Sequence, residues 1–374
     1  MVMRLGLIST YLPQECGVAR YTSFLAEALI DVDSSLEIRV IAERGAEPVR
    51  GDRVEVLPCW QRDGKYQEEM LDQTEDLDLI HVQHEYSIYG FDNRLPAFLE
   101  SLPSDIRKIV TIHCVRPAQF SPRGDLDERY AARIAQLADR VIVHLDSQRA
   151  ILTRCGVDEE KISVIPHGTM ITDEDRDTSR GELGLSGDVK LLLMFGFIKR
   201  HKCYEVALDA LYEIMKERDD VYLFIAGTLH PSAKRDDKMY LESIKDKISE
   251  LGLDEHVIFP DIFYPDEEVP NLMAASDIVL FHYFEEDRSA SGALHLAIGA
   301  GRPVIATRIP KFEELRNVSD ELLVLPFSPS GLAQLARRIL GDDGFREYIL
   351  RRIDLYRRET SWHAVARKHL EVYE

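Results

Sequence analysis

The feature that most constrains the fold is a regular alternation of short apolar runs with longer helical segments along the whole chain. In the first half the apolar runs predict strands at residues 4–9, 37–42, 79–83, 108–113, 140–145 and 162–166. In the second half they predict strands at residues 190–196, 221–226, 256–259, 278–281, 304–306 and 322–324. Such alternation is typical of a parallel sheet covered by helices on both faces. We therefore predict an α/β protein with doubly wound parallel sheets.

A polar stretch separates the two halves. Residues 172–188 read TDEDRDTSRGELGLSGD and suit a linker between domains. The chain has 374 residues, which is enough for two domains of about 150 residues each. We predict Rossmann-like domains at residues 1–171 and 189–355 that face each other across a cleft. Ligands of such sheets bind where the strands end and the loops meet.

Composition excludes several classes of protein. The formal net charge of −20 argues against a nucleic-acid partner, because phosphate recognition needs clustered Lys and Arg. Residues 345–359 are arginine-rich, so peripheral contact with a membrane is conceivable, but a solvated helix face is favoured. No apolar run reaches the roughly 18 residues that span a bilayer. The five cysteines are odd in number and lack a metal-binding spacing, which is typical of reduced thiols in the cytoplasm.

The sequence SASGALHLAIGAGRPVIAT, at residues 289–307, predicts a helix followed by a short buried strand. Ser289 or Ser291 is suited to cap the helix, and Gly301 before Arg302-Pro303 is a helix stop. The free N–H groups and the partial positive charge of such a helix start favour an anion. An ordinary capped helix without a ligand is the alternative. The first strand-to-helix turn lacks G-x-G-x-x-G, which disfavours a nicotinamide dehydrogenase.

Six segments follow one another along the chain: STYLPQECGVARYT, HVQHEYSIYG, TIHCVRP, VIPHGT, MFGFIKRHKCYEVALDAL and SASGALHLAIGAGRPVIAT. In their order and spacing they resemble nucleotide-sugar glycosyltransferases of the GT-B fold, in glycosyltransferase family four. The resemblance implies transfer of a hexose from a nucleoside-diphosphate sugar to a hydroxyl of a sugar or glycan acceptor, with retention of configuration. It also implies that residues 356–374 form a closing helix that returns to the first domain, and that neither a cofactor nor a metal is needed.

The resemblance assigns Lys202 to the donor diphosphate. The departing diphosphate gains negative charge as the glycosidic bond breaks, so a positive charge placed beforehand favours the reaction. The family often has an arginine directly after the glycine of this strand, where this chain has Phe197. We expect Lys199, Arg200 or Arg288 to supply the missing charge. An ordinary solvated lysine is the alternative reading of Lys202.

Two residues of the first domain match family positions near the donor. Gly17 stands where the family usually has a glycine pair, with Cys16 replacing the other glycine, and its backbone is expected to approach the sugar phosphate. A simple turn before a helix is the alternative. His113 ends a predicted strand and matches the family histidine near the donor sugar, where it hydrogen-bonds a hydroxyl. A structural histidine is its alternative.

The resemblance also gives the start of the SASG helix a role. The amides of Ser291, Gly292 and Ala293 would receive the donor diphosphate, with the hydroxyl of Ser289 or Ser291 adding a bond. The loop that contains Ile262 is expected to line the nucleobase, mostly with backbone.

The chain departs from the family at its paired glutamates. Aligned on GRPVI, the two acidic positions are Arg288 and Leu296. Glu285, Glu286 or Asp287 would replace the first glutamate if the loop shifts, whereas nothing nearby replaces the second, which contacts the nucleotide ribose. His295 is expected to point elsewhere on the helix.

Histidines 81 and 84 raise the possibility of a metal site. Residues three apart on a strand point to opposite faces, so a shared metal is disfavoured. We expect His84 to lie at the edge of the cleft instead.

Two other functions remain open from the sequence. The lost glutamates favour a non-catalytic GT-B scaffold that binds a nucleotide sugar or supports a partner transferase. A nucleotide-sugar epimerase would need a convergent acid and base set, which the sequence does not display.

Overall fold

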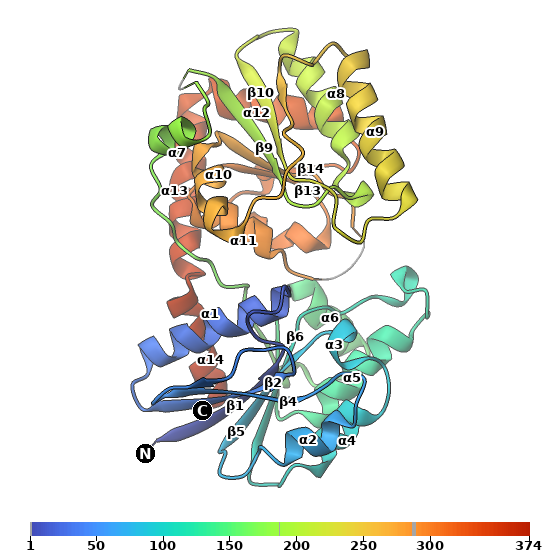
Figure 1. The fold of residues 1–374 in the computed structure, drawn as a ribbon, viewed down its shortest axis with the longest axis vertical. Helices are drawn as coiled ribbons and strands as arrows, with labels where there is room; N and C mark the ends of the chain where they lie inside the picture. The colour runs from blue at the N-terminus through green and yellow to red at the C-terminus, as the bar shows by residue number, and fades with distance from the viewer. Residues whose placement is uncertain (1, 187, 286–288) are drawn as a thin grey trace. The chain divides into compact units, whose positions relative to one another are not determined.

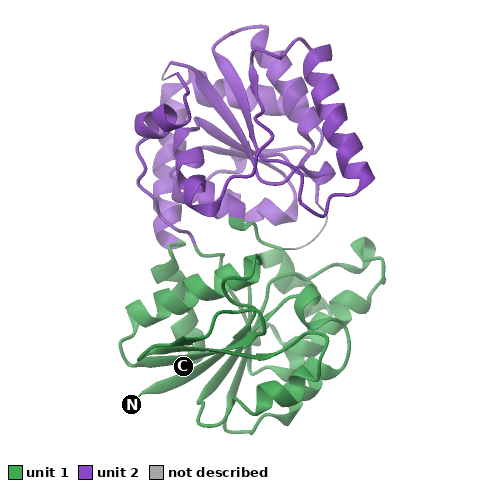
Figure 2. Ribbon diagram, viewed as in Figure 1, with its two compact units in different colours: residues 1–168, 286–292, 360–374 green, residues 169–285, 293–359 purple. Residues whose placement is uncertain are grey.

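The computed structural model describes residues 2–186, 188–285 and 289–374. These residues form two compact units, shown in different colours in Figure 2. Unit 1 contains residues 2–168, 289–292 and 360–374, and unit 2 contains residues 169–285 and 293–359. The chain therefore returns to unit 1 twice: once briefly at residues 289–292 and again for its last 15 residues.

The sheet of unit 1 has the strand order β3-β4-β2-β1-β5-β6-β7-β8 (Figure 1). Its neighbouring strands are parallel, apart from the antiparallel pair β3 and β4. The strands are β1 (Met3–Ser9), β2 (Leu36–Glu43), β3 (Val49–Arg50), β4 (Val54–Trp60), β5 (Leu79–His84), β6 (Arg107–Ile112), β7 (Arg140–Val143) and β8 (Ile162–Val164). The order reverses at β1, between β2 and β5, as in other doubly wound sheets.

The sequence prediction missed β3 and β4. Only Val56 and Trp60 are buried on β4, and its Pro58 is uncommon within a strand. A half-exposed strand with a proline carries little of the apolar signal that identified the others.

Helices cover the sheet of unit 1, and the first and last helices of the chain pack together there (Figure 1). The longer ones are α1 (Gly17–Val32), α2 (Tyr66–Leu71), α4 (Arg94–Ser101), α5 (Leu126–Leu137), α6 (Asp146–Arg154) and α14 (Trp362–Tyr373). Short turns are α3 (Tyr86–Tyr89), η1 (Ala118–Phe120) and η2 (Glu159–Lys161). A Cβ at Gly168 would lie 2.2 Å from the Trp362 ring, so α14 closes tightly on this glycine.

Unit 2 has a parallel sheet in the order β11-β10-β9-β12-β13-β14. Its strands are β9 (Lys190–Phe195), β10 (Val221–Ala226), β11 (Val257–Ile258), β12 (Ile278–Phe281), β13 (Val304–Thr307) and β14 (Leu323–Val324). Its main helices are α7 (Arg176–Glu182), α8 (Tyr204–Met215), α9 (Arg235–Glu250), α10 (Val269–Ala275), α11 (Gly292–Gly299, whose first residue belongs to unit 1), α12 (Pro329–Gly341) and α13 (Asp343–Glu359). Short 3-10 turns are η3 (Arg200–Lys202), η4 (Asp266–Glu268), η5 (Pro310–Asn317) and η6 (Asp320–Leu322). Here the order reverses at β9, between β10 and β12. The predicted fold class, two doubly wound parallel-sheet units, is confirmed.

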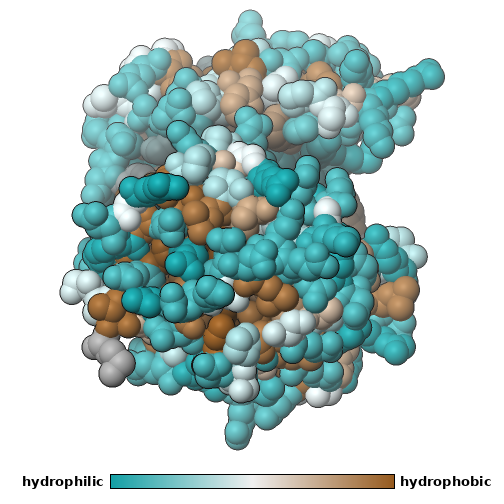
Figure 3. All heavy atoms as spheres, turned by 60° about the horizontal axis from the view of Figure 1, so that its bottom comes forward, coloured by the Kyte–Doolittle hydropathy of each residue, from teal (hydrophilic) through white to brown (hydrophobic). Residues whose placement is uncertain are grey.

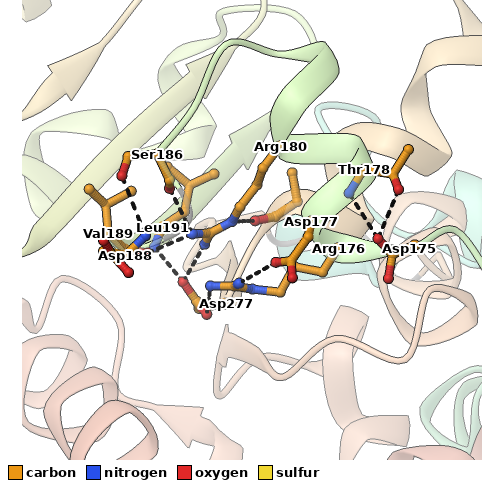
Figure 4. A network of polar contacts seen from close by, with 11 residues as sticks. Asp175, Arg176, Asp177, Thr178, Arg180, Ser186, Asp188, Val189, Leu191 and Asp277 are labelled. Carbon is orange, nitrogen blue, oxygen red and sulfur yellow. Dashed lines mark hydrogen bonds and ion pairs between the residues drawn. The ribbon is translucent and has the colours of Figure 1, made fainter.

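The stretch predicted as a linker contains α7, which is anchored in unit 2 (Figure 4). The Arg180 side chain is 1% exposed and donates hydrogen bonds to the carbonyls of Ala275 and Val189 at 2.8 and 2.7 Å. Its guanidinium also contacts Asp277 at 2.7 Å. Residues 172–188 are therefore not a bare linker. Seven residues with so few apolar side chains show no helical periodicity in the sequence.

The surface is mainly hydrophilic, with apolar areas scattered between polar side chains on the face shown in Figure 3. Across residues 2–186, 188–285 and 289–374, no helix combines the length and the apolar character needed to cross a bilayer.

Candidate functional site

The first group of candidate residues lies at the carboxyl ends of the strands of unit 2, where its strand order reverses. Gly196, directly after β9, has φ of 92°, and a Cβ there would lie 2.8 Å from Lys202 Nζ. A Cβ at Gly227 would lie 2.2 Å from the Gly196 carbonyl oxygen. Because these two glycines have no side chain, the loops after β9 and β10 can come into contact, and the Lys202 ammonium group can lie against the end of β9.

Lys202 is held against the end of its own strand. Its Nζ donates a hydrogen bond to the Phe195 carbonyl at 2.7 Å and lies 5.5 Å from the centre of the Tyr283 ring. Burial lowers the pKa of this lysine to about 7, and the nearby Glu285 carboxylate only partly opposes that shift. A lysine with this pKa is not an ordinary solvated side chain. A ligand with negative charge would restore its proton.

Glu285, in the loop after β12, contacts a second lysine that the sequence analysis did not identify. Its Oε2 lies 2.8 Å from Lys311 Nζ, and its Oε1 lies 3.9 Å from His201 Nε2. The Lys311 side chain is 13% exposed. Burial lowers the pKa of His201, Glu285 opposes this, and the charges of Lys202 and Lys311 lower it further. Lys311 therefore pairs with the Glu285 carboxylate, and the charge of that carboxylate also acts on His201 and Lys202.

The signal that could have indicated Lys311 is its position after a strand, whereas Lys202 was assigned through the family resemblance. Lys311 follows β13 by four residues, and loops after neighbouring parallel strands meet at one edge of the sheet. The last segment that resembles the family ends at Thr307, before this loop.

The other cations proposed from the sequence are engaged elsewhere or not described. Arg200 stacks over the Tyr240 ring at 4.7 Å, and Lys199 lies 3.6 Å from Asp237. Arg288, together with Glu286 and Asp287, lies outside the described residues. Lys202 and Lys311 are consequently the lysines that the structure brings together at this strand edge, around Glu285.

Aromatic rings replace the expected arginine beside this cluster. Phe197 stacks on Phe263 with ring centres 5.7 Å apart and meets His230 edge-on at 4.8 Å. Phe263 is 57% exposed and Ile262, beside it, is 49% exposed. The loop that was expected to line a nucleobase thus presents an aromatic and an aliphatic side chain to solvent.

The SASG segment leads into α11. Ser289 pairs with Cys114 through an isolated antiparallel bridge, and Ser291 is buried, both within unit 1. A Cβ at Gly292 would lie 3.5 Å from His167 Nε2 in the same unit. Ala293 continues the helix in unit 2 and packs partly against the core there.

The positions later in α11 show what occupies the place of the missing ribose glutamate. Leu296 is partly buried and packs on the apolar core of unit 2. His295 points into the core, where its Nε2 lies 2.9 Å from Glu314 and its Nδ1 lies 2.6 Å from the Thr169 hydroxyl. His295 is therefore engaged in the core of unit 2, and the described residues of α11 include no carboxylate in place of Leu296.

In unit 1, the tautomer of His113 is set by a chain of hydrogen bonds. His144 Nδ1 lies 2.9 Å from the Ile165 carbonyl, so this nitrogen must donate. His144 Nε2 then accepts from His113 Nδ1 at 3.0 Å, and His113 Nε2 meets the side-chain amide of Gln83 at 2.9 Å. The Gln83 atom at this contact is Oε1. Because Nε2 of the neutral ring is an acceptor, a hydrogen bond there requires the amide to be turned over so that its NH₂ group faces His113.

His113 is also enclosed by neighbouring rings. The Tyr21 ring meets it edge-on at 4.7 Å, and burial followed by the charges of His144 and His167 lowers its pKa well below the ordinary value. His113 is thus a neutral, fixed imidazole. His144 ends β7 as His113 ends β6, and the same strand-end rule would have identified it.

The C-terminal helix α14 packs beneath this cluster. The Tyr21 hydroxyl lies 3.3 Å from His369 Nε2, and the Tyr373 hydroxyl lies 2.8 Å from His81 Nδ1. His81 Nε2 also meets the Thr111 hydroxyl at 2.7 Å. His81 is therefore a satisfied core histidine.

The prediction for His84 is wrong. Its ring is fully buried, and it stacks on Tyr89 with ring centres 6.1 Å apart. Among the described residues neither ring nitrogen has a hydrogen-bond partner, and burial lowers its pKa to about 4. A strand buried on both faces leaves no edge for this side chain. The described part of the chain contains no group of three or more His, Cys, Asp or Glu placed to hold a metal ion.

Gly17 begins α1 and is exposed. A Cβ there would have no heavy atom within 4 Å among the described residues, and its φ is not in the left-handed region. The turn itself does not require glycine at this position.

Two family models match the chain, one in each half. "Glycosyltransferase Family 4" matches residues 16–171, and "Glycosyl transferases group 1" matches residues 189–342. The chain belongs to the family-four glycosyltransferases of the GT-B fold. An uncharacterized glycosyltransferase of Methanocaldococcus jannaschii, MJ1607, is 28% identical to this family-four chain over 227 residues, covering 58% of it and 54% of the relative. The D-inositol 3-phosphate glycosyltransferase of a Nocardioides species is 26% identical over 251 residues, covering 64% and 54%.

The family-four chain spans about half the length of these curated relatives. Among solved structures, Anabaena Alr3699/HepE in complex with UDP matches its fold with a TM-score of 0.74 at 16% identity, covering 99% of both chains. The predicted family and fold are thereby confirmed.

Proposed function

We propose that this glycosyltransferase moves a hexosyl group from a nucleoside-diphosphate sugar to a hydroxyl of a sugar or glycan acceptor, with retention of configuration. The observation that carries the proposal is the pair of lysines, Lys202 and Lys311, beside the strand-order reversal of unit 2. Support for the donor class comes from the solved neighbour, whose complexes contain UDP and UDP-glucose. The hexose and the retention of configuration rest on the resemblance to the family.

In the proposed mechanism the two lysines stabilise the negative charge of the leaving group. As the anomeric bond breaks, its electron pair stays with the diphosphate, and two ammonium groups stabilise that charge. Lys311 takes the role that an arginine at the Phe197 position would have. Glu285 holds Lys311 in place until the diphosphate arrives, and His201 lies within reach of the same carboxylate.

In this proposal His113 supplies a fixed neutral imidazole to the donor sugar. Its Nδ1 proton is committed to His144, so Nε2 is the atom that a sugar hydroxyl would meet in place of Gln83. The amides of Ser291, Gly292 and Ala293, with the Ser289 hydroxyl, are proposed as further diphosphate donors. Gly17 is proposed to let the donor approach the backbone of its loop closely. We also propose that no metal or cofactor takes part.

Lys202→Met tests the proposal. The purified protein would be incubated with UDP-, GDP- and ADP-sugars, and release of the nucleoside diphosphate would be measured. We expect turnover to fall about 100-fold or more, the effect of losing one charge-stabilising group at about 3 kcal/mol. Lys216→Met is the matched control, since Lys216 also pairs with a glutamate, Glu213, at 2.6 Å on the exposed end of α8. Turnover of Lys202→Met within a few-fold of the control would reject the assignment.

A second candidate function is a non-catalytic nucleotide-sugar-binding subunit. The observation that favours it is Leu296, whose apolar side chain packs on the core where the family has a ribose carboxylate. Such a subunit would gain thermal stability from a nucleotide sugar without releasing any nucleoside diphosphate, so binding and release measured on one sample separate the two functions.

A further inference from the structure

A cavity of unit 2 lies at the amino end of its sheet, opposite the end that carries Lys202 and Lys311. Its volume is about 390 Å³, and Lys190, Asp277 and Pro303 line it from the starts of β9, β12 and β13. The Lys202 and Lys311 cluster lies at the carboxyl ends of the same strands. Since β9 has six residues at about 3.3 Å each, the two places are roughly 20 Å apart. The amino-end cavity has no part in the proposed glycosyl transfer.

Positive charge exceeds negative charge in this cavity. Four cationic side chains line it, and they are Arg176, Lys190, Arg302 and Arg346. Two carboxylates, Asp188 and Asp277, face them. The chain as a whole carries a formal charge of −20, so a local excess of cations is unusual for its surface.

The Asp277 carboxylate is already occupied (Figure 4). Its Oδ1 pairs with Arg176 at 3.1 Å, and its Oδ2 accepts from Arg180 at 2.7 Å and from the Leu191 amide at 2.7 Å. It therefore has little capacity left for another cation.

Arg302 and Lys190 have no carboxylate within ion-pair distance among the described residues. The Arg302 guanidinium donates from Nε to the Ala300 carbonyl at 3.2 Å. Burial lowers its pKa, as does the positive charge of Arg176, while Asp277 only partly opposes this. A half-buried guanidinium beside other arginines is stabilised when an anion binds.

A cavity in unit 1 serves as a comparison, because equal numbers of positive and negative side chains line it. It has a volume of about 510 Å³ and is lined by Arg4, Arg39, Arg50 and Arg53 together with Glu37, Asp52, Glu55 and Asp76. Four carboxylates meet four arginines there, and Arg4–Glu37 and Arg39–Glu55 pair at 3.7 and 3.5 Å. The charges that line the unit 1 cavity are thus equal in number, whereas the lining of the unit 2 cavity has two more cations than carboxylates. Of these cations, Arg346 pairs with Asp343 outside the lining at 2.8 Å, and Arg176 pairs with Asp277.

We propose that the amino-end cavity of unit 2 binds the phosphate group of a small molecule. The guanidinium of Arg302 offers two parallel N–H donors that match phosphate geometry, and Lys190 adds a second positive charge. Leu340 and Leu350 line another wall of the cavity and offer an apolar surface to the organic part of a phosphate monoester.

Thermal shift of the full chain at constant ionic strength tests this site. The probes are inorganic phosphate, glucose 6-phosphate and, as the uncharged comparison, glucose. We expect both phosphates to raise the melting temperature and glucose to have no effect. Equal responses would show that phosphate alone is recognised, and a stronger response to glucose 6-phosphate would show that the organic part contributes.

Substitutions of the cavity residues test whether the thermal shift comes from phosphate bound in this cavity. We expect Arg302→Gln to weaken phosphate binding about tenfold, and Lys190→Met to weaken it by a smaller factor. The control is Arg351→Gln, on α13 like Arg346 but with a side chain that is 70% exposed. Lys202→Met should respond like the wild type, which excludes binding at the carboxyl-end lysines.

Two results would overturn the proposal: no response of the wild type to either phosphate, or equal responses of Arg302→Gln, Lys190→Met and the wild type. The site is independent of the proposed glycosyl transfer, so nucleoside-diphosphate binding by Arg302→Gln should be unchanged.

Discussion

The histidine cluster of unit 1 and the lysine cluster of unit 2 both lie at the carboxyl ends of parallel strands, but they are built on different principles. In unit 1, burial lowers the pKa of His113 and keeps its ring neutral, and a hydrogen bond between His113 and His144 fixes the two rings. In unit 2, Glu285 pairs with Lys311 and its charge also acts on His201 and Lys202, while burial lowers the pKa of Lys202 to about 7. The first cluster holds neutral rings in a fixed geometry, and the second supplies positive charge that can stabilise a bound anion. The same strand-end position therefore serves either purpose, depending on what surrounds it.

The largest expected difference between the clusters is their response to acid. His84 and His369 in unit 1 have a pKa of about 4, because both are buried, and His81 and His113 are also lowered. The unfolded chain binds these protons near pH 6.5, so stability falls as the pH drops from 6.5 towards 4. Each histidine with a pKa of about 4 should cost about 2 kcal/mol at pH 5. Hydrogen exchange at pH 7.5 and pH 5 should show unit 1 losing protection first.

His84→Leu is the control for the expected loss of unfolding free energy at acid pH. This ring has no hydrogen-bond partner among the described residues, so an apolar replacement should fold and should recover about 2 kcal/mol at pH 5. Among the described residues of unit 2, His282 is the buried histidine with a pKa of about 4. Equal loss of protection in both units at pH 5 would show that the unit 1 histidines do not govern acid stability.

Lys311→Met tests whether Lys311, as well as Lys202, stabilises the bound diphosphate. We expect nucleoside-diphosphate affinity to fall about 30-fold, because a charge-assisted hydrogen bond contributes about 2 kcal/mol. Affinity for the corresponding monophosphate should change much less. Calorimetric titration of both nucleotides gives the two values, and Lys216→Met is again the control. Equal losses for the two nucleotides would mean that Lys311 does not contact the outer phosphate.

The sequence predicted the alternation of elements well because buried parallel strands carry strong apolar signals, as β10 and β12 show. It missed β3 and β4, which are half exposed, and α7, whose Arg180 is buried by specific polar contacts. At the site, motif order pointed to Lys202 and His113, and the structure shows what holds each of them. Lys311 and His144 were missed because they lie outside the recognised motifs. Their relevance depends on strand neighbours, and the sequence alone does not give strand order.

A smaller effect is expected from titration of Lys202. Its pKa in the empty cluster is about 7, and a bound diphosphate would favour the charged form. The lysine then takes up a proton on binding, so nucleoside-diphosphate affinity should fall about tenfold between pH 6 and pH 8. Calorimetry in buffers with different ionisation enthalpies measures this proton uptake. Lys202→Met should abolish the uptake, and an unchanged uptake in that variant would assign it to another group, such as His201.

The smallest expected effect is a gain in nucleotide affinity. It concerns Leu296, where unit 2 departs from its family. Leu296 lies on α11 and is partly buried against the core, so Leu296→Glu should lower stability slightly. If the ribose lies beside this helix, the new carboxylate would accept its hydroxyls and raise nucleotide affinity about fivefold. Leu296→Gln has nearly the same size without the charge and should gain less. Comparing each nucleotide with its 2′,3′-dideoxy analogue isolates the ribose contact, because the analogue cannot donate to Glu. A gain that persists with the analogue would place the ribose elsewhere, and the carboxylate would then act through charge alone, close enough to the lysine cluster to alter it.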